Sequence, residues 1–386
     1  MKREQSVDNG PHNIEAPARH RAWFVDRPIC GVPGPDDFRL IEEDTPRPAE
    51  GQLLVRTIYI SIAPGVRPLL PYASDRPDVA GDSSTGRKDA SKDHVTNPMQ
   101  IRVGERMRSG IVPAMSAYSG GAVGQVVESR AAGFAPGDYV FGGLLWQEYE
   151  VLDAPAVLKL DPADLPIEAD LTLVGRSSFT GCVGYRRFCD AKAGETMVVS
   201  AAAGAVGMLV VQMAKADGLR VVGIVSGADK CRFVTDKLGA DACIDRTAED
   251  VGEALDRLLP EGVDIYFDNV AGRTQLPVFN RLKPFGRLIV CGMAAEYNGA
   301  ESSTLPTGMI LAKRLRIHGF VVLDHEEDYA AFRSDVARLW KEGKLIYEHQ
   351  LYPGLESAPQ ALADCLTGAN GGGKILVHVS PDTSKG

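Results

Sequence analysis

Hydrophobic and polar residues follow two different patterns in this chain, and the change falls near residue 171. Before it, short apolar segments are separated by turns rich in proline and glycine, with no long helical pattern between them. These segments predict β-strands at residues 38–42, 51–61, 120–129, 138–141 and 146–151. Short strands joined by turns are typical of a mostly antiparallel, barrel-like domain.

From residue 171 onward, apolar strands alternate with helical patterns. Helices are expected at 171–188, 208–216, 229–238, 248–258 and 274–282, and strands at 195–200, 220–226, 242–244, 263–267, 287–291 and 316–322. This alternation predicts a doubly wound α/β domain, in which helices cover both faces of a parallel sheet.

The end of the chain returns to the first pattern. A helix expected at 329–343 is followed by residues 352–354, a helix at 358–366, a glycine-rich turn at 371–373 and a closing strand at 374–379. Because the closing strand resembles those of the first half, we expect an inserted α/β domain. The predicted division is 175–344 for the α/β domain, and 21–174 with 345–386 for the domain that surrounds it.

Two polar segments interrupt these patterns. Residues 1–20 carry no periodicity and predict a disordered leader without the apolar core of a signal peptide, so a cytoplasmic protein is expected. Residues 72–97 are rich in Asp, Ser, Gly, Arg and Lys, which favours a solvated loop over a lid on an active site.

Composition excludes several classes of function. The 386 residues carry a formal net charge of −9, which argues against a general binder of nucleic acid or of an anionic membrane. No apolar run is long enough to span a bilayer. The seven cysteines and seven histidines are dispersed without CxxC or HExxH spacing, so neither a disulfide framework nor a metal site is expected.

The strand at 197–200, the turn after it and the helix at 208–216 carry the clearest motif. Gly204 and Gly207 match the dinucleotide fingerprint, and Ala202 stands where its first glycine would be. Small residues there let the main chain approach a pyrophosphate at the helix N-terminus. A purely structural turn is the alternative, but the strand–helix–strand context favours cofactor binding. The expected contact residues are Ala203, Gly204, Ala205, Val206 and Gly207.

Several motifs together resemble those of a known family. They are Ala201–Gly207, Asp229-Lys230, Tyr266–Val270, Gly286-Arg287, Cys291-Gly292, Tyr297-Asn298 and Phe320–Val322. The chain resembles the zinc-free medium-chain dehydrogenases/reductases, in the branch of prostaglandin, curcumin and alkenal double-bond reductases. The resemblance is nearly continuous from about residue 104 and looser before it. It implies a GroES-like β domain around a Rossmann domain, a small-molecule substrate and a homodimer.

The end of the second strand of the motif indicates which dinucleotide is used. An enzyme that selects NAD usually carries an acid there, whereas this strand ends at Ser226 and Gly227. Lys230 stands where the family places its phosphate-binding lysine, and Arg246 stands where relatives often have a tyrosine facing the same phosphate. Both cations could instead be solvated surface charges, but with the missing acid they predict NADPH.

Without zinc ligands, the expected chemistry is conjugate reduction of an enone. Hydride goes to the β-carbon of an α,β-unsaturated ketone or aldehyde, charge collects on the carbonyl oxygen as an enolate, and the α-carbon is then protonated. The resemblance places Tyr297 at the nicotinamide and substrate, where with the cofactor ribose it would stabilise the enolate. The alternative is a tyrosine that merely packs on a loop.

The resemblance implies further cofactor contacts at Asn269, Cys291, Phe320, Val322 and Asn370. Cys291 is expected as a small packing residue and not as a nucleophile. Residues 320–322 could also form an edge strand that pairs with a second subunit, or simply belong to the core of the sheet. Asn370 belongs to a family element that carries an apparent one-residue insertion here.

The expected substrate pocket departs from the family pattern. Gly65 and Cys182 each stand where relatives carry a tyrosine, while Arg67 is retained. Together with Tyr297 these residues predict a wider pocket for a bulky or aromatic enone. Quinone reduction, zinc-free oxidation of a specialised secondary alcohol, and NADPH binding without catalysis remain the alternative functions.

Overall fold

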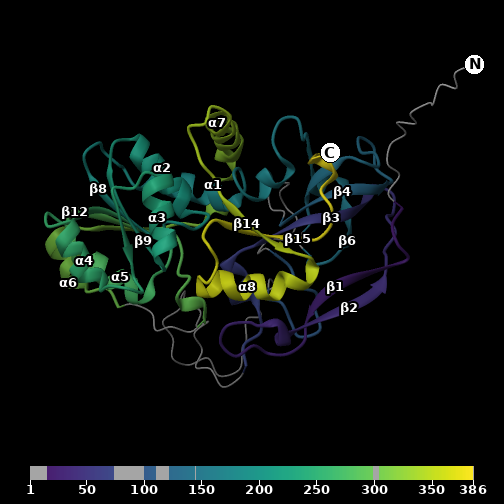
Figure 1. Cartoon of the computed structure of the whole chain (residues 1–386), viewed down its shortest axis with the longest axis horizontal. Helices are drawn as coiled ribbons and strands as arrows, with labels where there is room; N and C mark the ends of the chain where they lie inside the picture. The colour runs from purple at the N-terminus through teal and green to yellow at the C-terminus, as the bar shows by residue number, and fades with distance from the viewer. Residues whose placement is uncertain (1–14, 74–99, 110–120, 144, 299–303, 386) are drawn as a thin grey trace, which may run out of the picture.

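The computed structural model describes residues 15–73, 100–109, 121–143, 145–298 and 304–385. The expected disorder of residues 1–14 and the expected loop at 74–97 lie outside these ranges. Within them the chain forms two sheet-based domains side by side, each with its own helices (Figure 1).

The first domain is built on a seven-stranded sheet within the described residues, in the order β14-β15-β3-β4-β5-β7, with β6 also paired to β3. Its strands are β3 (Gln52–Ile62), β4 (Ala122–Ser129), β5 (Tyr139–Gly142), β6 (Tyr149–Asp153), β7 (Leu158–Leu160), β14 (His349–Pro353) and β15 (Lys374–His378). All pairs are antiparallel except β14 with β15. A separate hairpin pairs β1 (Arg19–Val25) with β2 (Phe38–Asp44). Because β15 pairs with β3, the last part of the chain completes the first sheet.

The second domain is a parallel six-stranded sheet in the order β10-β9-β8-β11-β12-β13. Its strands are β8 (Thr196–Ser200), β9 (Arg220–Val225), β10 (Ala242–Asp245), β11 (Val263–Asp268), β12 (Leu282–Val290) and β13 (Arg316–Gly319). The helices that accompany this sheet are α1 (Arg176–Val183), α2 (Gly207–Ala216), α3 (Ala228–Arg232), α4 (Val251–Leu258), α5 (Gly272–Asn280), α6 (Thr307–Lys313) and α7 (Tyr329–Lys341). The remaining helix, α8 (Ala358–Thr367), lies under β15 of the first domain (Figure 1).

Alternation along the central strands explains why both faces of this sheet are covered. Val199 of β8 packs with α2 and its neighbour Val198 packs with α4 and α5, and both side chains are fully buried. A strand buried on both faces reads as a continuous apolar run, as it does here. The predicted fold, a Rossmann sheet within a mostly antiparallel β domain, is confirmed. The domain boundaries at 174/175 and 344/345 stay predictions.

Three local expectations are wrong. Arg19 and His20 belong to β1 and not to a disordered leader, and His20 is buried between Glu43 and the ring of Tyr149. The helix expected from residue 171 begins at Arg176 and widens into a π-type turn at Gly184–Phe188. The strand expected at 316–322 ends at Gly319, because the ring of Phe320 turns inward against Gly184.

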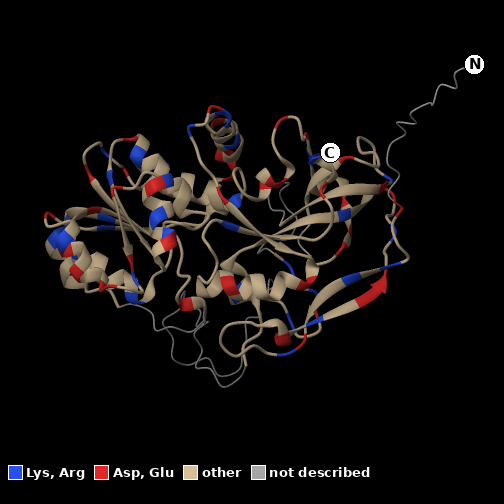
Figure 2. Cartoon of the chain, in the orientation of Figure 1, with Lys and Arg blue, Asp and Glu red and all other residues tan. Residues whose placement is uncertain are grey.

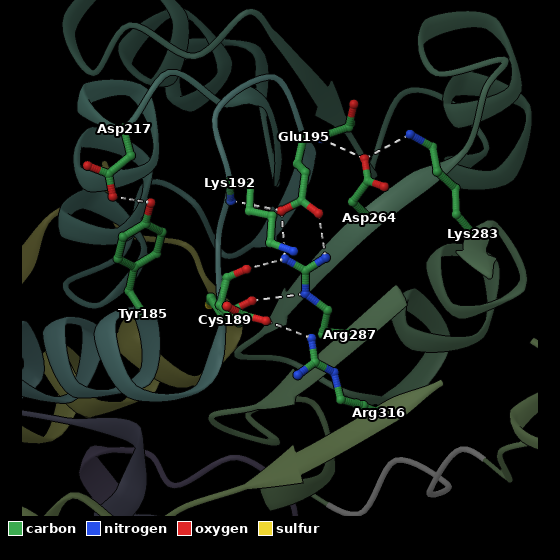
Figure 3. A network of polar contacts seen from close by, with 11 residues as sticks. Tyr185, Cys189, Lys192, Glu195, Asp217, Asp264, Lys283, Arg287 and Arg316 are labelled. Atoms are coloured by element: carbon green, nitrogen blue, oxygen red, sulfur yellow. Dashed lines mark hydrogen bonds and ion pairs between the residues drawn. The ribbon is translucent and has the colours of Figure 1, made fainter. Parts of the chain in front are cut away.

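A largely buried ion pair lies near the amino end of β8, away from the fingerprint turn that follows this strand. Arg287 of β12 bonds both carboxylate oxygens of Glu195, at 2.7 and 2.6 Å, and the carbonyl oxygens of Cys189 and Asp190 (Figure 3). Four hydrogen bonds satisfy the guanidinium, which is why a nearly buried arginine is tolerated there. The pair ties β12 to the start of β8.

Charges of both signs are interspersed over the two domains (Figure 2). Among the described residues, no helix combines the length and the apolar character needed to cross a membrane.

Candidate active site

A cleft of about 710 Å³ lies between the two domains, at the carboxyl ends of β8, β9 and β11. The second domain contributes the fingerprint turn and the loops after β9, β10, β11 and β12. The first domain contributes residues 61–66, at the end of β3 and just beyond it, and residues within 365–375, from the end of α8 into β15. Open α/β sheets bind their ligands at this end of the strands, and the volume is in the range of ligand pockets.

The fingerprint turn is held tightly by main-chain contacts. Ala201 adopts a left-handed φ of +48°, and its carbonyl oxygen accepts a hydrogen bond from the Gly204 N–H. Ala201 therefore takes up the turn conformation that a glycine adopts more easily. The Gly373 N–H donates to the Ala203 carbonyl oxygen at 2.7 Å, so the loop before β15 closes over the turn. Each of the five expected contact residues, Ala203 to Gly207, lines the cleft.

Ser226, Lys230 and Arg246 meet at one end of the cleft. The Lys230 ammonium donates to the Gly368 carbonyl oxygen at 2.7 Å and to Asn370 Oδ1 at 3.4 Å. Burial and then the charge of Arg246 hold its pKa below the usual value. The two cations face the same space, so their positive charges repel each other. A bound anion would relieve this repulsion, which makes this part of the cleft a candidate anion site.

An acid also lies near this end of the cleft, which the sequence did not reveal. Asp245, at the end of β10, accepts hydrogen bonds from the N–H groups of Gly227 and Thr247 and from the Thr247 hydroxyl. These bonds engage the carboxylate at the turn after β9, and Asp245 is not among the residues that line the cleft. It therefore shapes the turn that carries Ser226.

A buried carboxylate positions the loop after β11. Asp268 is fully buried and accepts hydrogen bonds from the Ser200 hydroxyl, from the N–H groups of Val270 and Ala271, and from the Gln275 amide. Asn269 is held from two sides by Ser200, through its own N–H and its side-chain amide, at 2.8 Å each. The loop is therefore rigid where Asn269 faces the cleft.

Tyr297 lies in a single 3-10 turn (η7, Glu296–Asn298) after β12, and it lines the cleft together with Cys291. Burial raises the pKa of the Tyr297 hydroxyl, so it stays protonated at neutral pH and can donate a hydrogen bond. Burial also raises the pKa of Cys291 to about 12, so its thiol is not poised as a nucleophile.

Three expected site residues do not line the cleft. Cys182 is buried among the side chains of α1, α2 and α7, Phe320 packs on Phe188, and the fully buried Arg67 donates to the Gly31 carbonyl oxygen. The sequence shows which loop a residue belongs to but not which way its side chain turns, and the roles of these three residues at the site stay predictions. Gly65, Val322 and Asn370 do line the cleft, as expected.

The cleft also contains polar residues that sequence reasoning missed. They are Asp170, Arg176, Ser177, Thr180, Arg273, Thr274 and Lys374. The Lys374 ammonium is buried and donates to the Ile62 carbonyl oxygen at 2.7 Å. Lys374 was visible as the end of the glycine-rich family element, whereas the other six follow no pattern that separates them from ordinary helix and loop residues.

Within the described residues, one group of three side chains has the geometry of a possible metal site. His325, Glu327 and Asp328 bring their ligand atoms within 4.8 Å of one another, outside the cleft. Arg187 forms ion pairs with both carboxylates, so both are already engaged with a cation of the protein itself.

Comparisons with known proteins agree with this geometry. Residues 205–338 match the family described as "Zinc-binding dehydrogenase", and residues 21–86 match "N-terminal domain of oxidoreductase". The chain is 34% identical to the "NADPH-dependent curcumin reductase" of Escherichia coli (strain K12) over 371 residues, which is 94% of this chain and 98% of the relative. It is 36% identical to the "2-alkenal reductase (NADP(+)-dependent)" of Nicotiana tabacum over 265 residues, 68% of this chain and 77% of the relative.

Among solved structures, CurA from Vibrio vulnificus in complex with NADPH superposes with a TM-score of 0.78 at 31% identity, over 94% of this chain and 100% of that one. The Escherichia coli quinone oxidoreductase complexed with NADPH shares the fold, with a TM-score of 0.67 at 19% identity, over 93% of this chain and 99% of that one. The chain belongs to the medium-chain dehydrogenase/reductase family, in the zinc-free branch of curcumin, alkenal, pulegone and prostaglandin reductases.

Proposed function

We propose that this protein reduces the carbon–carbon double bond of α,β-unsaturated ketones or aldehydes with NADPH. The observation that carries the proposal is one continuous cleft with two cations and a partly buried tyrosine among its lining residues, and burial raises the pKa of that tyrosine. The names of its curcumin, alkenal and pulegone reductase relatives support the same reaction and cofactor.

The residues of the cleft fit NADPH. Lys230 and Arg246 supply two positive charges for the 2′-phosphate, and Ser226 adds a hydroxyl donor. The N-terminus of α2 follows the fingerprint turn, where its N–H groups favour a pyrophosphate. Asn269 and Val322 would border the nicotinamide half. When bound, NADPH supplies the hydride that the β-carbon of the enone accepts.

The protein's own part in the reaction is to hold the substrate and stabilise charge. We assign to Tyr297 the hydrogen bond to the carbonyl oxygen, where negative charge collects as the β-carbon is reduced. Its raised pKa suits this role, because a donor that keeps its proton stabilises the enolate without being consumed. No cleft residue is assigned to a metal.

The decisive experiment measures NADPH consumption against a panel of enones, quinones, ketones and secondary alcohols, with identification of the products. Saturated ketones formed from enones, together with loss of turnover in Tyr297→Phe, support the proposal. Preferential turnover of quinones under anaerobic conditions, oxidation of an alcohol, or tight NADPH binding without any turnover would each replace it with the corresponding alternative.

We also propose a cytoplasmic homodimer. β13 is the outer strand of the parallel sheet and all four of its residues are exposed. Exposed apolar side chains occur on it and close to it in the sequence, namely Ile317 in β13, Leu311 on α6 before it and Val321 after it. An exposed sheet edge with apolar neighbours favours pairing with a second copy. Sedimentation analysis of the protein with and without Ile317→Lys tests the dimer, and cell fractionation tests the location.

A further inference from the structure

One hydrogen bond joins the two domains at the main chain of Tyr297. The Tyr72 hydroxyl donates to the Tyr297 carbonyl oxygen at 2.9 Å. Tyr72 follows a 3-10 turn of the first domain (η2, Pro64–Leu69), and Tyr297 lies in η7 of the second. The contact therefore crosses from one domain to the other.

Arg67 and a short main-chain pairing hold Tyr72 in place. The Arg67 guanidinium carbon lies 4.0 Å from the centre of the Tyr72 ring, and Arg67 is itself anchored on the Gly31 carbonyl oxygen at 2.9 Å. On the other side, the N–H of Ile29 donates to Pro71 and the N–H of Ala73 donates to Ile29, which pairs Tyr72 with Ile29. These contacts hold the Tyr72 ring in place independently of the hydrogen bond from its hydroxyl to Tyr297.

Arg67 is fully buried although it does not line the cleft. Burial of a guanidinium is costly, and its contact with the Tyr72 ring and its hydrogen bond to Gly31 each offset part of that cost. Because η7 is only a single turn of 3-10 helix, its orientation depends on contacts from outside the turn. A donor that acts on a developing charge must be held within a fraction of an ångström.

We propose that Tyr72 is a positioning residue for Tyr297, and that Arg67 holds Tyr72 for this task. Neither touches the substrate. Tyr72 fixes the main chain of η7 so that the Tyr297 hydroxyl faces the enone carbonyl, and it does so only when the two domains are correctly placed. The inference rests on the proposed role of Tyr297 in enone reduction.

A double-mutant cycle tests it, with Tyr72→Phe, Tyr297→Phe and the double variant in the full-length protein. Tyr72→Phe keeps the ring that Arg67 stacks on and removes only the hydroxyl. We expect it to lower kcat for an enone roughly three- to tenfold, the effect of one hydrogen bond, with the NADPH Kd unchanged and the Tm only slightly lower. In the Tyr297→Phe background, Tyr72→Phe should lower kcat no further.

Tyr139→Phe is the matched control, because the Tyr139 hydroxyl bonds Thr383 on the exposed surface. It should leave kcat unchanged in both backgrounds. Arg67→Lys provides a second route, since it keeps the charge but removes the planar group that stacks on Tyr72. It should lower kcat in the native background and have no effect on kcat once Tyr297 is Phe.

Two results would overturn the positioning role alone: an unchanged kcat in Tyr72→Phe, or equal losses from Tyr72→Phe with and without the Tyr297 hydroxyl. Unchanged kcat in Tyr297→Phe, or no turnover of any enone by the native protein, would overturn the proposed function as well. The two failures are therefore distinguishable.

Discussion

A Cβ atom added to Gly207 would lie 2.4 Å from the carbonyl oxygen of Ala201 and within 2.9 Å of two main-chain atoms of Ala202. Since main-chain atoms cannot turn aside, Gly207→Ala must displace the fingerprint turn. We expect it to lower the free energy of unfolding by about 1–3 kcal/mol and to weaken NADPH binding strongly. Thermal denaturation and fluorescence titration measure the two effects.

Gly204→Ala is the graded control for this prediction. Its Cβ would meet the same carbonyl oxygen at 3.1 Å, which a small shift of the turn can relieve. The loss of stability should stay below about 1 kcal/mol, within the range of a mild substitution. Equal effects of the two variants would show that the close approach at Gly207 is not what shapes the turn.

The cofactor preference should depend on Lys230 and Arg246. Lys230→Ala and Arg246→Ala are each expected to raise the Kd for NADPH roughly 10- to 100-fold, the value of a charge-assisted hydrogen bond, while the Kd for NADH changes little. Arg232→Ala is the matched control, since Arg232 lies on the same helix but pairs with Asp229 in solvent. A parallel loss of affinity for both cofactors would mean that the cations serve the fold and not the 2′-phosphate.

The shape of the substrate pocket should depend on Gly65. It lines the cleft without a side chain, so a bulky or aryl-substituted enone should be turned over with a higher kcat/KM than a short alkenal. Gly65→Tyr should lower kcat/KM for the aryl enone by at least tenfold and spare the short alkenal, which serves as the internal control. A native preference for the short alkenal would contradict the wide pocket. Cys182 is buried in the core and does not line the cleft, so its size does not set the width of the pocket.

NADPH affinity should fall as pH rises through about 8. Burial lowers the pKa of Lys374 from 10.5 to about 8, although the neighbouring Cys365 opposes this shift. Below pH 8 the ammonium is charged and attracts the phosphates of the cofactor, and above it the charge is lost. Between pH 8 and 10.5 the unfolded chain binds more protons than the folded one, so this group alone makes the free energy of unfolding increase with pH.

Isothermal titration of NADPH between pH 7 and 9 measures this effect. Lys374→Met keeps the length of the side chain and removes the charge, so its Kd should be higher at pH 7 and should lack the part of the pH slope that Lys374 causes. An identical slope in Lys374→Met would assign the pH dependence to another group, of which the partly buried Lys230 is the nearest alternative.

The sequence predicted the elements of this fold well because periodicity is a local property. Segments such as Met197–Ser200 are buried on both faces of the sheet, and their nearly continuous apolar sequence predicts a buried strand. It predicted the main-chain features of the site for the same reason, since Gly204 and Gly207 must be small wherever the turn is used. It did not give the side-chain directions of Arg67, Cys182 and Phe320, because these directions depend on tertiary neighbours such as Tyr72 and Gly184. The Tyr72–Tyr297 bond joins residues far apart in sequence, and no local pattern encodes it.

The loop that closes over the fingerprint turn makes the end of the chain part of the cofactor pocket. Gly373 pairs with Gly204, and the Lys230 ammonium is bonded to Gly368. During synthesis on the ribosome, the fingerprint turn therefore emerges before the residues that complete its pocket. We expect an isolated fragment of residues 175–344 to bind NADPH far more weakly than the full chain, because it carries the fingerprint and lacks the part of the wall that residues 365–375 form.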